Sequence, residues 1–390
     1  MFSADEIKKF TKLPTPFYYY DMSLLENTLQ QVKLASDKYK YTVHYALKAN
    51  ANDPILEQIQ QHGFGADCVS GNEIKKALEM NFLSEQIAFA GVGKSDAEIN
   101  IALEKNIFCF NCESVQEIEV INTLAEKQEK IASIALRINP NVNAHTHHYI
   151  TTGLEENKFG INVWELDEVL AIIEKSKHIQ LTGIHFHIGS QITDMGVFKS
   201  LCLKINELQQ WFAMRKINLE HINAGGGLGV DYQDPDKNSI PDFYAYFGIF
   251  NQFLEVRNGQ KIHFELGRAM VAQCGNLISK VLFVKKGIAK NFIILDAGMT
   301  ELIRPALYQS YHKIENITKN IPSDQKYDVV GPICESSDCF GKSVHLPETE
   351  RGDLIVLKTT GAYGEVMSSG YNLREKAAAF YSDKIMTSKK

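Results

Sequence analysis

The sequence predicts a two-domain α/β protein, in which a (β/α)8 TIM-like barrel is followed by a C-terminal, mainly antiparallel β domain. Eight short apolar or β-branched runs alternate with amphipathic stretches whose apolar residues recur at three- and four-residue spacing. Alternating strands and helices favour a parallel sheet, and eight such units favour a closed barrel. After about residue 270 the apolar runs are separated by turn residues instead of helices, which favours a β domain there.

The elements of the barrel can be taken in chain order. The eight expected strands are VHYALK, FGADC, IAFAG, IFCFNC, SIALRINP, TGIHFHIG, HINAGGG and KIHFELG, which begin near Val43, Phe64, Ile87, Ile107, Ser133, Thr182, His221 and Lys261. Helices are expected between most of them, for example over GNEIKKALEM and FKSLCLKINELQQWF. The long interval between the fifth and sixth strands holds a polar insertion, residues 141–160, which we interpret as an active-site loop.

The β domain is expected to comprise residues 271–390 together with residues 1–22, and the barrel residues 23–270. LISKVLFVKK, NFIILDAGM, YDVVGPIC and GDLIVLKTTG are its expected strands, and the opening PFYYYD also has the pattern of a strand. A doubly wound sheet is the alternative fold, and the abrupt change to β texture after the eighth strand argues against it.

Composition limits the classes of function. A chain of 390 residues is too long for one small core, and its net charge of −6 gives no basic footprint for nucleic acid. The sequence has no apolar stretch of about 18 residues and no signal-peptide core at its N-terminus, so no membrane partner is expected. The seven cysteines are an odd number spread along the chain, unlike a secreted disulfide framework, and we expect a cytoplasmic protein.

Polar residues gather where the expected strands end, which is the catalytic rim of a barrel. Six strands contribute to this group, and its members are Lys48, Asp67, Arg137, His187, Gly225, Gly226, Gly227, Gly229, Glu265 and Arg268. Because so many strands deliver polar groups to one rim, the pattern favours an enzyme.

Two members of this group indicate a particular chemistry. Lys48 follows an apolar run, and a low-dielectric site disfavours an ammonium and exposes a nucleophilic amine that can condense with an aldehyde. The alternative is a lysine that reaches from a strand end into solvent. The glycine run at Gly225 can form an anion-binding nest, although glycine runs also form plain turns.

Histidines and cysteines leave a metal enzyme open as a competing class. His185 and His187 face one side of a strand, and His145, His147 and His148 lie in the polar insertion. No carboxylate or lysine arrangement completes a ligand set, so we expect no metal, and His185 itself fits a packed or hydrogen-bonded residue. Cys109 and Cys112 form an isolated C-x-x-C, to which we give no function.

Seven segments occur in an order that identifies a family. YALKAN, HFHIGSQ, GGGLG, FELGR, LIRPALY, CESSD and GAYG appear along nearly the whole chain. Together they resemble the fold type III, alanine-racemase-like decarboxylases that depend on pyridoxal 5'-phosphate (PLP), and most closely the members that act on diaminopimelate. A decarboxylase of another basic amino acid or of carboxynorspermidine, and a non-catalytic PLP-binding member of the family, are the alternatives.

The resemblance implies roles for individual residues toward the cofactor. Lys48 would hold PLP covalently, His187 would stack on its ring, and Glu265 would face its pyridine nitrogen. Asp67 and Arg137 belong to the expected cofactor site. The groups implied to hold the phosphate are Ser190, Gly225, Gly226, Gly227, Gly267, Arg268 and Tyr363.

The resemblance also implies the reaction, which converts meso-2,6-diaminopimelate to L-lysine and CO2 as the last step of lysine biosynthesis. The distal end of this substrate carries both an ammonium and a carboxylate. The residues expected to bind the substrate are Arg268, Arg304, Tyr308, Glu335 and Tyr363, with the arginines and Tyr308 for the carboxylate and Glu335 for the ammonium.

Two further expectations concern proton transfer and assembly. Cys334 would be the general acid that reprotonates the product. In the family that the chain resembles, the active site forms across a homodimer, so Cys334 and Glu335 would come from the partner subunit. Ornithine decarboxylases of the same fold, by resemblance, have no counterpart of LIRPALY, and this segment decides the expected substrate.

Overall fold

The computed structural model describes residues 2–142, 158–319, 321–322 and 324–386, and its internal contacts divide the chain into two compact units. The barrel unit comprises residues 29–229 and 242–270, and the β unit comprises residues 1–28, 230–241 and 271–390. The expected domain boundaries after residues 22 and 270 stay predictions. Most of the expected active-site loop, with His145, His147 and His148, lies outside the described residues.

Eight parallel strands close the barrel, as the sequence predicted. The strands are β2 (Thr42–Ala46), β3 (Gly65–Cys68), β4 (Ile87–Phe89), β5 (Cys109–Cys112), β6 (Ala132–Asn139), β8 (Ile179–His185), β9 (His221–Asn223) and β10 (Lys261–Leu266). Each pairs with its neighbours in the chain, and β10 pairs back onto β2. The short β7 (Ile161–Asn162) adds a parallel partner to the end of β6. This closed order excludes the doubly wound alternative.

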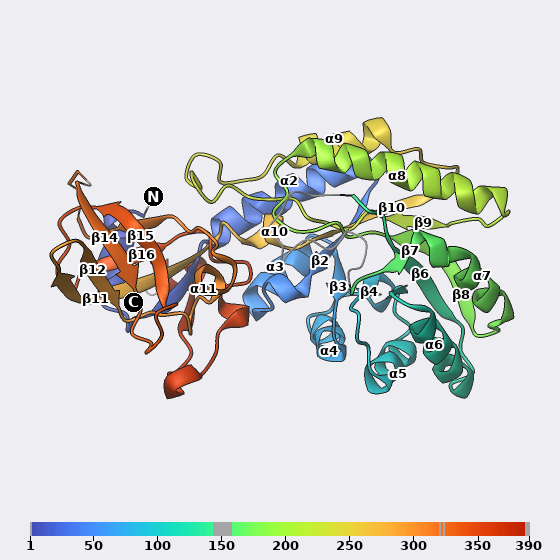
Figure 1. Ribbon diagram of the computed structural model, residues 1–390, viewed down its shortest axis with the longest axis horizontal. Coiled ribbons are helices and arrows are strands. Elements are labelled where there is room, and N and C mark those ends of the chain that lie inside the picture. Colours follow the sequence, from blue (N-terminus) through green and yellow to red (C-terminus); the bar gives the residue numbers. More distant parts are fainter. Residues whose placement is uncertain (1, 143–157, 320, 323, 387–390) are drawn as a thin grey trace. The chain divides into compact units, whose positions relative to one another are not determined.

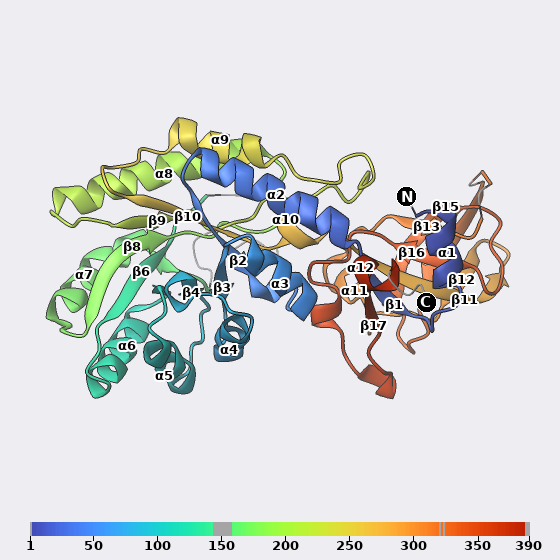
Figure 2. The ribbon, with the colours of Figure 1, turned by 180° about the vertical axis from the view of Figure 1, so that it is seen from behind.

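Helices cover the outside of these strands (Figures 1 and 2). They are α3 (Asp53–Gln61), α4 (Gly71–Glu79), α5 (Asp96–Lys105), α6 (Val115–Lys127), α7 (Leu166–Lys175), α8 (Met195–Met214) and α9 (Phe243–Phe253). Along α8 the buried residues include Val197, Leu201, Ile205 and Leu208, which recur every three or four positions. Burial of this one apolar face fixes which side of the helix meets the strands. Two helices, α2 (Met22–Lys38) and α10 (Arg268–Val271), cross between the units.

The starts of two helices also shape the loops at the catalytic rim. Ser70 caps α4, and Glu73 in its first turn accepts a hydrogen bond from the Val69 N–H (2.7 Å). At α6 the same spacing recurs, and Glu117 accepts from the N–H of Glu113 (2.7 Å). Both glutamates therefore fold back on the loop that follows a barrel strand and stiffen it.

Nearer the amino ends of the strands, the barrel interior holds buried histidines that the sequence did not reveal. The rings of His44 and His263 stack with centroids 5.1 Å apart, and His44 Nε2 lies 2.8 Å from His263 Nδ1. Phe108 stacks on both rings, and His221 lies beside them. We call His44, His221 and His263 the histidine layer. Burial lowers the pKa of all three, to about 4 for His221, so the layer is neutral.

The described part of the β unit contains eight strands, and most of their pairings are antiparallel. They are β1 (Phe17–Tyr20), β11 (Gly275–Lys286), β12 (Asn291–Leu295), β13 (Ile314–Asn316), β14 (Gln325–Val330), β15 (Cys339–Leu346), β16 (Leu354–Leu357) and β17 (Ala378–Tyr381). Among the strands of the described residues in this unit, only β1–β17 and β12–β14 pair in parallel. Strand β1, expected from PFYYYD, lies between β11 and β17.

Three short helices accompany these strands, α1 (Ala4–Phe10), α11 (Arg304–Tyr308) and α12 (Ser382–Met386). One core cluster joins Phe10 of α1 to Phe17 and Tyr19 of β1 and to Val356 of β16. All seven cysteines of the chain are free thiols. Within the described residues, no helix is both long enough and apolar enough to cross a bilayer.

Candidate active site

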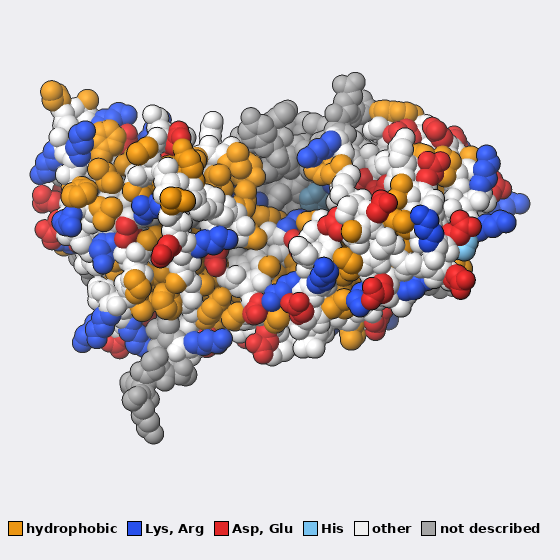
Figure 3. Space-filling model, turned by 90° about the horizontal axis from the view of Figure 1, so that it is seen from below, with side chains coloured by type: hydrophobic (Ala, Val, Ile, Leu, Met, Phe, Trp, Pro, Cys, Tyr) orange, Lys and Arg blue, Asp and Glu red, His pale blue; other side chains and the backbone are white. Residues whose placement is uncertain are grey.

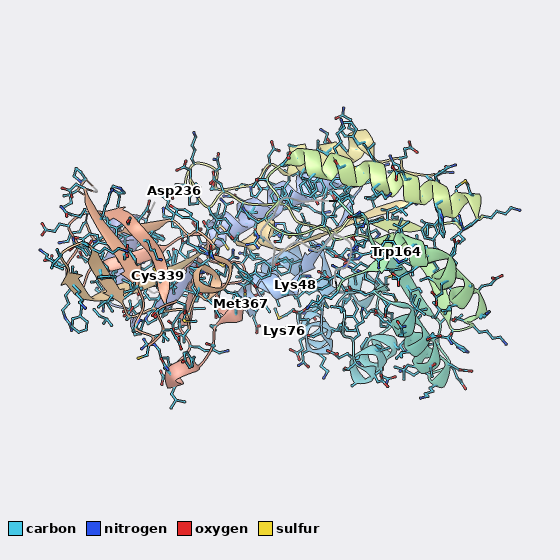
Figure 4. All side chains as sticks on the ribbon, in the orientation of Figure 1. Lys48, Lys76, Trp164, Asp236, Cys339 and Met367 are labelled. Atoms are coloured by element: carbon cyan, nitrogen blue, oxygen red, sulfur yellow. The ribbon has the colours of Figure 1, made fainter. Side chains whose placement is uncertain are left out.

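Lys48 and Asp67 form an ion pair at the rim of the barrel. Lys48 lies in a short 3-10 turn, Leu47–Ala49, directly after β2, and its Nζ is 2.8 Å from Oδ2 of Asp67 at the end of β3 (Figure 4). The Asp67 side chain is fully buried, whereas 35% of the Lys48 side chain is exposed. The expectation of a site that disfavours the ammonium was incomplete, because the carboxylate stabilises the charged form. Burial, followed by the charge of Glu265, raises the pKa of Asp67 against the effect of Lys48.

Glu265 lies in β10 and is held by three hydrogen-bond donors. Its Oε1 accepts from the side-chain amides of Asn111 (2.9 Å) and Asn223 (2.7 Å), and its Oε2 accepts from Nε2 of His185 (2.8 Å). The side-chain oxygen of Asn223 in turn accepts from the N–H of Gly225 (3.0 Å), which links the carboxylate to the glycine run. All four side chains are buried.

These donors keep Glu265 ionised although burial opposes a charge. Burial by itself raises the pKa of the carboxyl, but the charge and hydrogen bond of His185, followed by Lys48, lower it well below its usual range. Because the carboxylate is an acceptor only, the Nε2 of His185 carries a hydrogen. The structure therefore presents a fixed anion inside the barrel, and His185 is hydrogen-bonded, as the sequence indicated.

Arg137 is a second fixed charge in the barrel unit. Its Nη1 lies 2.7 Å from Oε1 of Glu113, and its guanidinium packs over the ring of Phe159 at 4.8 Å. The other oxygen of Glu113 accepts from the N–H of Gly160 (3.1 Å). The chain that returns from the long insertion is thus seated on the Arg137–Glu113 pair.

His187 follows β8 and is neutral in its surroundings. Burial, followed by the positive charges of Arg137 and Lys48, lowers its pKa well below the ordinary value. A neutral imidazole presents a planar face without a charge. Its expected stacking on a cofactor ring stays a prediction.

The glycine run leaves no room for side chains. A Cβ on Gly225 would meet the Phe186 carbonyl oxygen at 2.0 Å, and one on Gly226 would meet the Glu265 carbonyl oxygen at 1.9 Å. Gly225 also has a positive φ of 70°, which favours glycine. The run must therefore be bare backbone, which is what an anion-binding loop requires.

Ser190 and Arg268 lie together beside the same loop system. The hydroxyl oxygen of Ser190 accepts from Nε (3.2 Å) and Nη2 (3.0 Å) of Arg268. A Cβ on Gly267 would lie 3.1 Å from the Cβ of Ala49 and 3.2 Å from that of Ala46, so Gly267 packs closely against the turn that carries Lys48. The structure therefore pairs Ser190 with Arg268 and places Gly267 against the turn of Lys48.

Unsatisfied polar atoms test whether a cofactor such as PLP fits this barrel. Oδ1 of Asp67 and Nδ1 of His185 are buried without a hydrogen-bond partner in the described structure. Such atoms are costly unless a bound group supplies the partner. A lysine at the rim, a fixed carboxylate and a bare glycine loop are the three features that an aldehyde-bearing pyridine phosphate needs, so the residues fit the group.

The remaining expected residues lie in the β unit. Arg304 is buried at the start of α11, and its Nη1 donates to the carbonyl oxygen of Ala362 (3.4 Å), the neighbour of Tyr363. Tyr308 is one helical turn further along α11, and its side chain is half-buried. Tyr363 itself has a left-handed backbone with a φ of 58°. Non-glycine residues in this conformation are often found at functional sites.

Cys334 and Glu335 lie on an exposed turn of the β unit that Asp338 organises. The carboxylate of Asp338 accepts from the N–H groups of Ile333 (2.7 Å) and Met299 (2.6 Å). Cys334 is an exposed thiol, and Glu335 accepts from the hydroxyl of Tyr371 (2.8 Å). The turn is rigid while its thiol and carboxylate remain accessible.

Three residues of the site were missed by the sequence prediction, namely Asn111, Asn223 and Glu113. Asn111 and Asn223 are single polar residues in buried strands, and Glu113 directly follows one. The positional rule that selected Asp67 could have found them, since all three lie at carboxyl ends of barrel strands. Within the described residues, no three His, Cys, Asp or Glu side chains form a metal-ligand group.

The fold and the chemistry of the site fit a PLP-dependent decarboxylase, and comparison with known proteins shows this class. The model of the family described as "Pyridoxal-dependent decarboxylase, pyridoxal binding domain" matches residues 23–272. A diaminopimelate decarboxylase of Bacteroides thetaiotaomicron is 57% identical over 97% of this chain and 98% of its own length. The chain therefore belongs to the diaminopimelate decarboxylase family.

Solved structures agree with this assignment. Diaminopimelate decarboxylase from Helicobacter pylori, complexed with L-lysine, has a TM-score of 0.90 at 40% identity and covers 97% of this chain and 94% of its own. The enzyme from M. jannaschii, also in complex with L-lysine, has a TM-score of 0.88 at 32% identity, with 97% and 90% covered. A lysine decarboxylase from Selenomonas ruminantium, 22% identical, shares the fold.

Proposed function

We propose that this protein uses PLP to decarboxylate meso-2,6-diaminopimelate to L-lysine and CO2, the last step of lysine biosynthesis. The single observation that carries the chemistry is the buried, ionised Glu265, held by three donors in the same unit as Lys48. Whole-length relatives named for diaminopimelate support the substrate. The free thiols support a reducing, cytoplasmic location.

The barrel residues divide the work of binding the cofactor. The amine of Lys48 would hold the aldehyde, the neutral ring of His187 would cover one face of the pyridine, and Glu265 would keep the ring nitrogen protonated. The phosphate group would lie on the bare backbone of the glycine run and of Gly267, with Ser190 and Arg268 beside it. When bound, PLP supplies the electron sink that accepts the electron pair left by departing CO2.

Asp67 and Arg137 prepare the surroundings for this chemistry. Asp67 holds the Lys48 ammonium at the rim before the cofactor binds. Arg137 contributes a positive charge that keeps His187 neutral, and Glu113 fixes its position. These are roles in orientation and electrostatics, which enzyme sites use to stabilise charge that develops during reaction.

Residues of both positive and negative charge would bind the distal end of the substrate. Arg304 and Tyr308 share one face of α11, where a guanidinium and a phenol suit a carboxylate. Arg268 and Tyr363 would complete that half of the pocket, and Glu335 would bind the distal ammonium. A pocket with both signs selects diaminopimelate over amino acids that carry only a distal amine.

The proposed general acid, Cys334, requires a particular assembly of the protein. Cys334 would deliver a proton to the carbon that has lost CO2, and its exposure on the Asp338 turn makes the thiol available to a neighbouring site. We propose a homodimer in which Cys334 and Glu335 enter the partner's active site. Exposed hydrophobic side chains on the β unit support such an interface, among them Val366, Tyr371 and Leu373. Figure 3 shows hydrophobic side chains grouped on one face of this unit.

The proposal is tested by supplying purified protein and PLP with meso-diaminopimelate, ornithine, lysine and arginine in parallel. Release of lysine and CO2 from diaminopimelate alone is the expected result. Turnover of another of these amino acids would keep the PLP chemistry and overturn the reading of Arg304 and Glu335. Bound PLP without turnover of any substrate would indicate a non-catalytic member of the family.

A further inference from the structure

One segment of the chain leaves the barrel unit directly after the glycine run. Residues 230–241 belong to the β unit, although Gly229 before them and Asp242 after them belong to the barrel unit. The glycine run itself is pinned, because the N–H of Ile192 donates to the Gly227 carbonyl and the N–H of Gly229 donates to the Ile192 carbonyl. We call residues 230–241 the excursion.

The excursion is firmly attached to the β unit at Asp236 (labelled in Figure 4). Both carboxylate oxygens of Asp236 accept from the buried Nζ of Lys358, at 2.7 and 2.6 Å. Burial opposes the charge, but the Lys358 hydrogen bonds lower the pKa of Asp236 to about 2, so the pair is ionised at neutral pH. The side-chain amide of Gln273 also donates to the carbonyl oxygen of Asn238 (2.6 Å).

This attachment places one aromatic ring of the excursion against Arg304. Tyr232 is buried, and its ring centroid lies 5.5 Å from the guanidinium carbon of Arg304. The ring of His312 meets Tyr232 edge-on at 5.2 Å and 86°, and Nδ1 of His312 is bonded to the carbonyl oxygen of Lys358 (2.9 Å). His312 therefore supports the tyrosine ring from behind, and it is hydrogen-bonded to Lys358, the residue that anchors Asp236.

We propose that Tyr232 is a positioning residue, which holds the Arg304 guanidinium for the distal carboxylate of the substrate. The inference rests on the proposed function, in which Arg304 binds that carboxylate. A free arginine side chain has many rotamers, and a ring within about 6 Å attracts the cation and restricts it. The Ala362 carbonyl fixes a second point of the guanidinium, so a bidentate partner meets a preorganised group.

The test compares Tyr232→Leu with Tyr232→Phe, because phenylalanine retains the ring face and leucine does not. Tyr232→Leu is expected to raise KM for diaminopimelate about tenfold with kcat within about twofold of wild type, and Tyr232→Phe is expected to restore KM. Tyr19→Leu is the matched control: Tyr19 is also buried in the β unit, but its ring packs on that of Phe10, with centroids 4.8 Å apart. It is expected to lower the melting temperature without changing KM.

Inhibition by two diamines separates a loss of carboxylate recognition from a general loss of folding. L-lysine keeps the distal carboxylate of diaminopimelate, whereas cadaverine (1,5-diaminopentane) lacks it. Tyr232→Leu is expected to weaken inhibition by L-lysine about tenfold and to leave inhibition by cadaverine unchanged. Equal weakening of both inhibitors, or of neither, would overturn the role of Tyr232. If Tyr232→Leu does not fold, His312→Leu is the second variant, because it removes the support of the Tyr232 ring. It is expected to weaken inhibition by L-lysine and to leave inhibition by cadaverine unchanged.

Arg304→Ala distinguishes failure of this inference from failure of the proposed function. If Arg304→Ala leaves inhibition by L-lysine unchanged, Arg304 does not bind the carboxylate and the proposed pocket is wrong. If Arg304→Ala weakens inhibition by L-lysine but Tyr232→Leu does not, the proposed pocket is supported and the positioning role of Tyr232 is wrong. If both roles hold, the variant that combines Tyr232→Leu with Arg304→Ala is expected to bind L-lysine no more weakly than Arg304→Ala alone, because Tyr232 acts through Arg304.

Discussion

The carboxylate of Glu265 shows how a charge can be kept in a barrel interior. An isolated buried carboxylate would be protonated, because burial disfavours the anion. Here two amides and one imidazole satisfy both oxygens, and the pKa falls below its usual range. Its contribution to stability is therefore present above the pKa of the unfolded chain, near 4.5, and is lost as pH falls below that value.

Removing one donor is expected to disturb the cofactor more than the fold. In His185→Leu the pKa of Glu265 rises, because the largest favourable charge beside it is lost. We expect kcat to fall about tenfold or more, as the loss of a charged hydrogen bond costs about 1.5–3 kcal/mol. The pH dependence of the visible absorbance of bound PLP measures the change. His185→Gln supplies a replacement amide donor and should recover part of the loss, and a leucine variant with an unchanged absorbance profile would contradict the role.

Lys48 provides the most direct test of the chemistry. In Lys48→Ala we expect turnover to fall about a thousandfold or more, since no other described amine is paired with Asp67. Borohydride should no longer fix PLP to the protein, which mass spectrometry detects. Lys76→Ala is the control, because Lys76 lies in the same unit and pairs with Asp53 on the surface. Substantial turnover in Lys48→Ala would exclude the assignment.

Position along a strand explains which site residues the sequence could supply. Lys48, Asp67 and Glu265 stand out because charged residues at strand ends conflict with the apolar runs before them. Asn111 and Asn223 carry no charge. They lie three barrel strands and more than a hundred residues apart, so their convergence on Glu265 depends on closure of the barrel. A periodic pattern predicts the barrel but not which side chains meet across it.

At the scale of elements, the histidine layer sets an expected pH dependence. The pKa of each ring is lower in the folded than in the unfolded chain, so the layer stabilises the fold above about pH 6.5 and loses this stabilisation as pH falls. For His221, with a pKa of about 4, the loss between pH 7 and pH 4 is on the order of 3 kcal/mol. Urea unfolding at several pH values measures it.

The control for this prediction keeps the ring and removes the titration. His221→Phe is expected to flatten the fall in the free energy of unfolding between pH 7 and pH 4, although nearby His44, His263 and Lys261 still interact with one another. If the variant and the wild type show the same slope, another group controls acid stability.

The helices and strands also show which features of the fold a local sequence pattern can predict. All eight barrel strands were predicted, because alternation with amphipathic helices is a local property of the chain. The excursion was not recognised, since its anchor Asp236 finds Lys358 across 122 positions and no local pattern records that pairing. The histidine layer was missed for the same reason, because its rings come from three separate strands.

At the scale of the whole molecule, the proposed dimer predicts complementation between two inactive variants. Lys48→Ala and Cys334→Ala would each abolish every active site in their own homodimers. If each site combines Lys48 of one subunit with Cys334 of the other, exchange of subunits in an equal mixture should restore about a quarter of the wild-type turnover. Size-exclusion chromatography checks the assembly, and a mixture that stays inactive after subunit exchange would contradict a shared site.

Strand β1 has a consequence for how the chain acquires its fold during synthesis. It is synthesised before both of its neighbours, β11 and β17, and β17 begins only at Ala378. The barrel strands are complete by Leu266, so the barrel can form while FYYY still lacks both partners. Four aromatic residues that are buried in the finished protein must then stay exposed until these later strands have been synthesised. Early chaperone binding to this segment is the expected result, and ribosome profiling of chaperone-bound nascent chains would detect it.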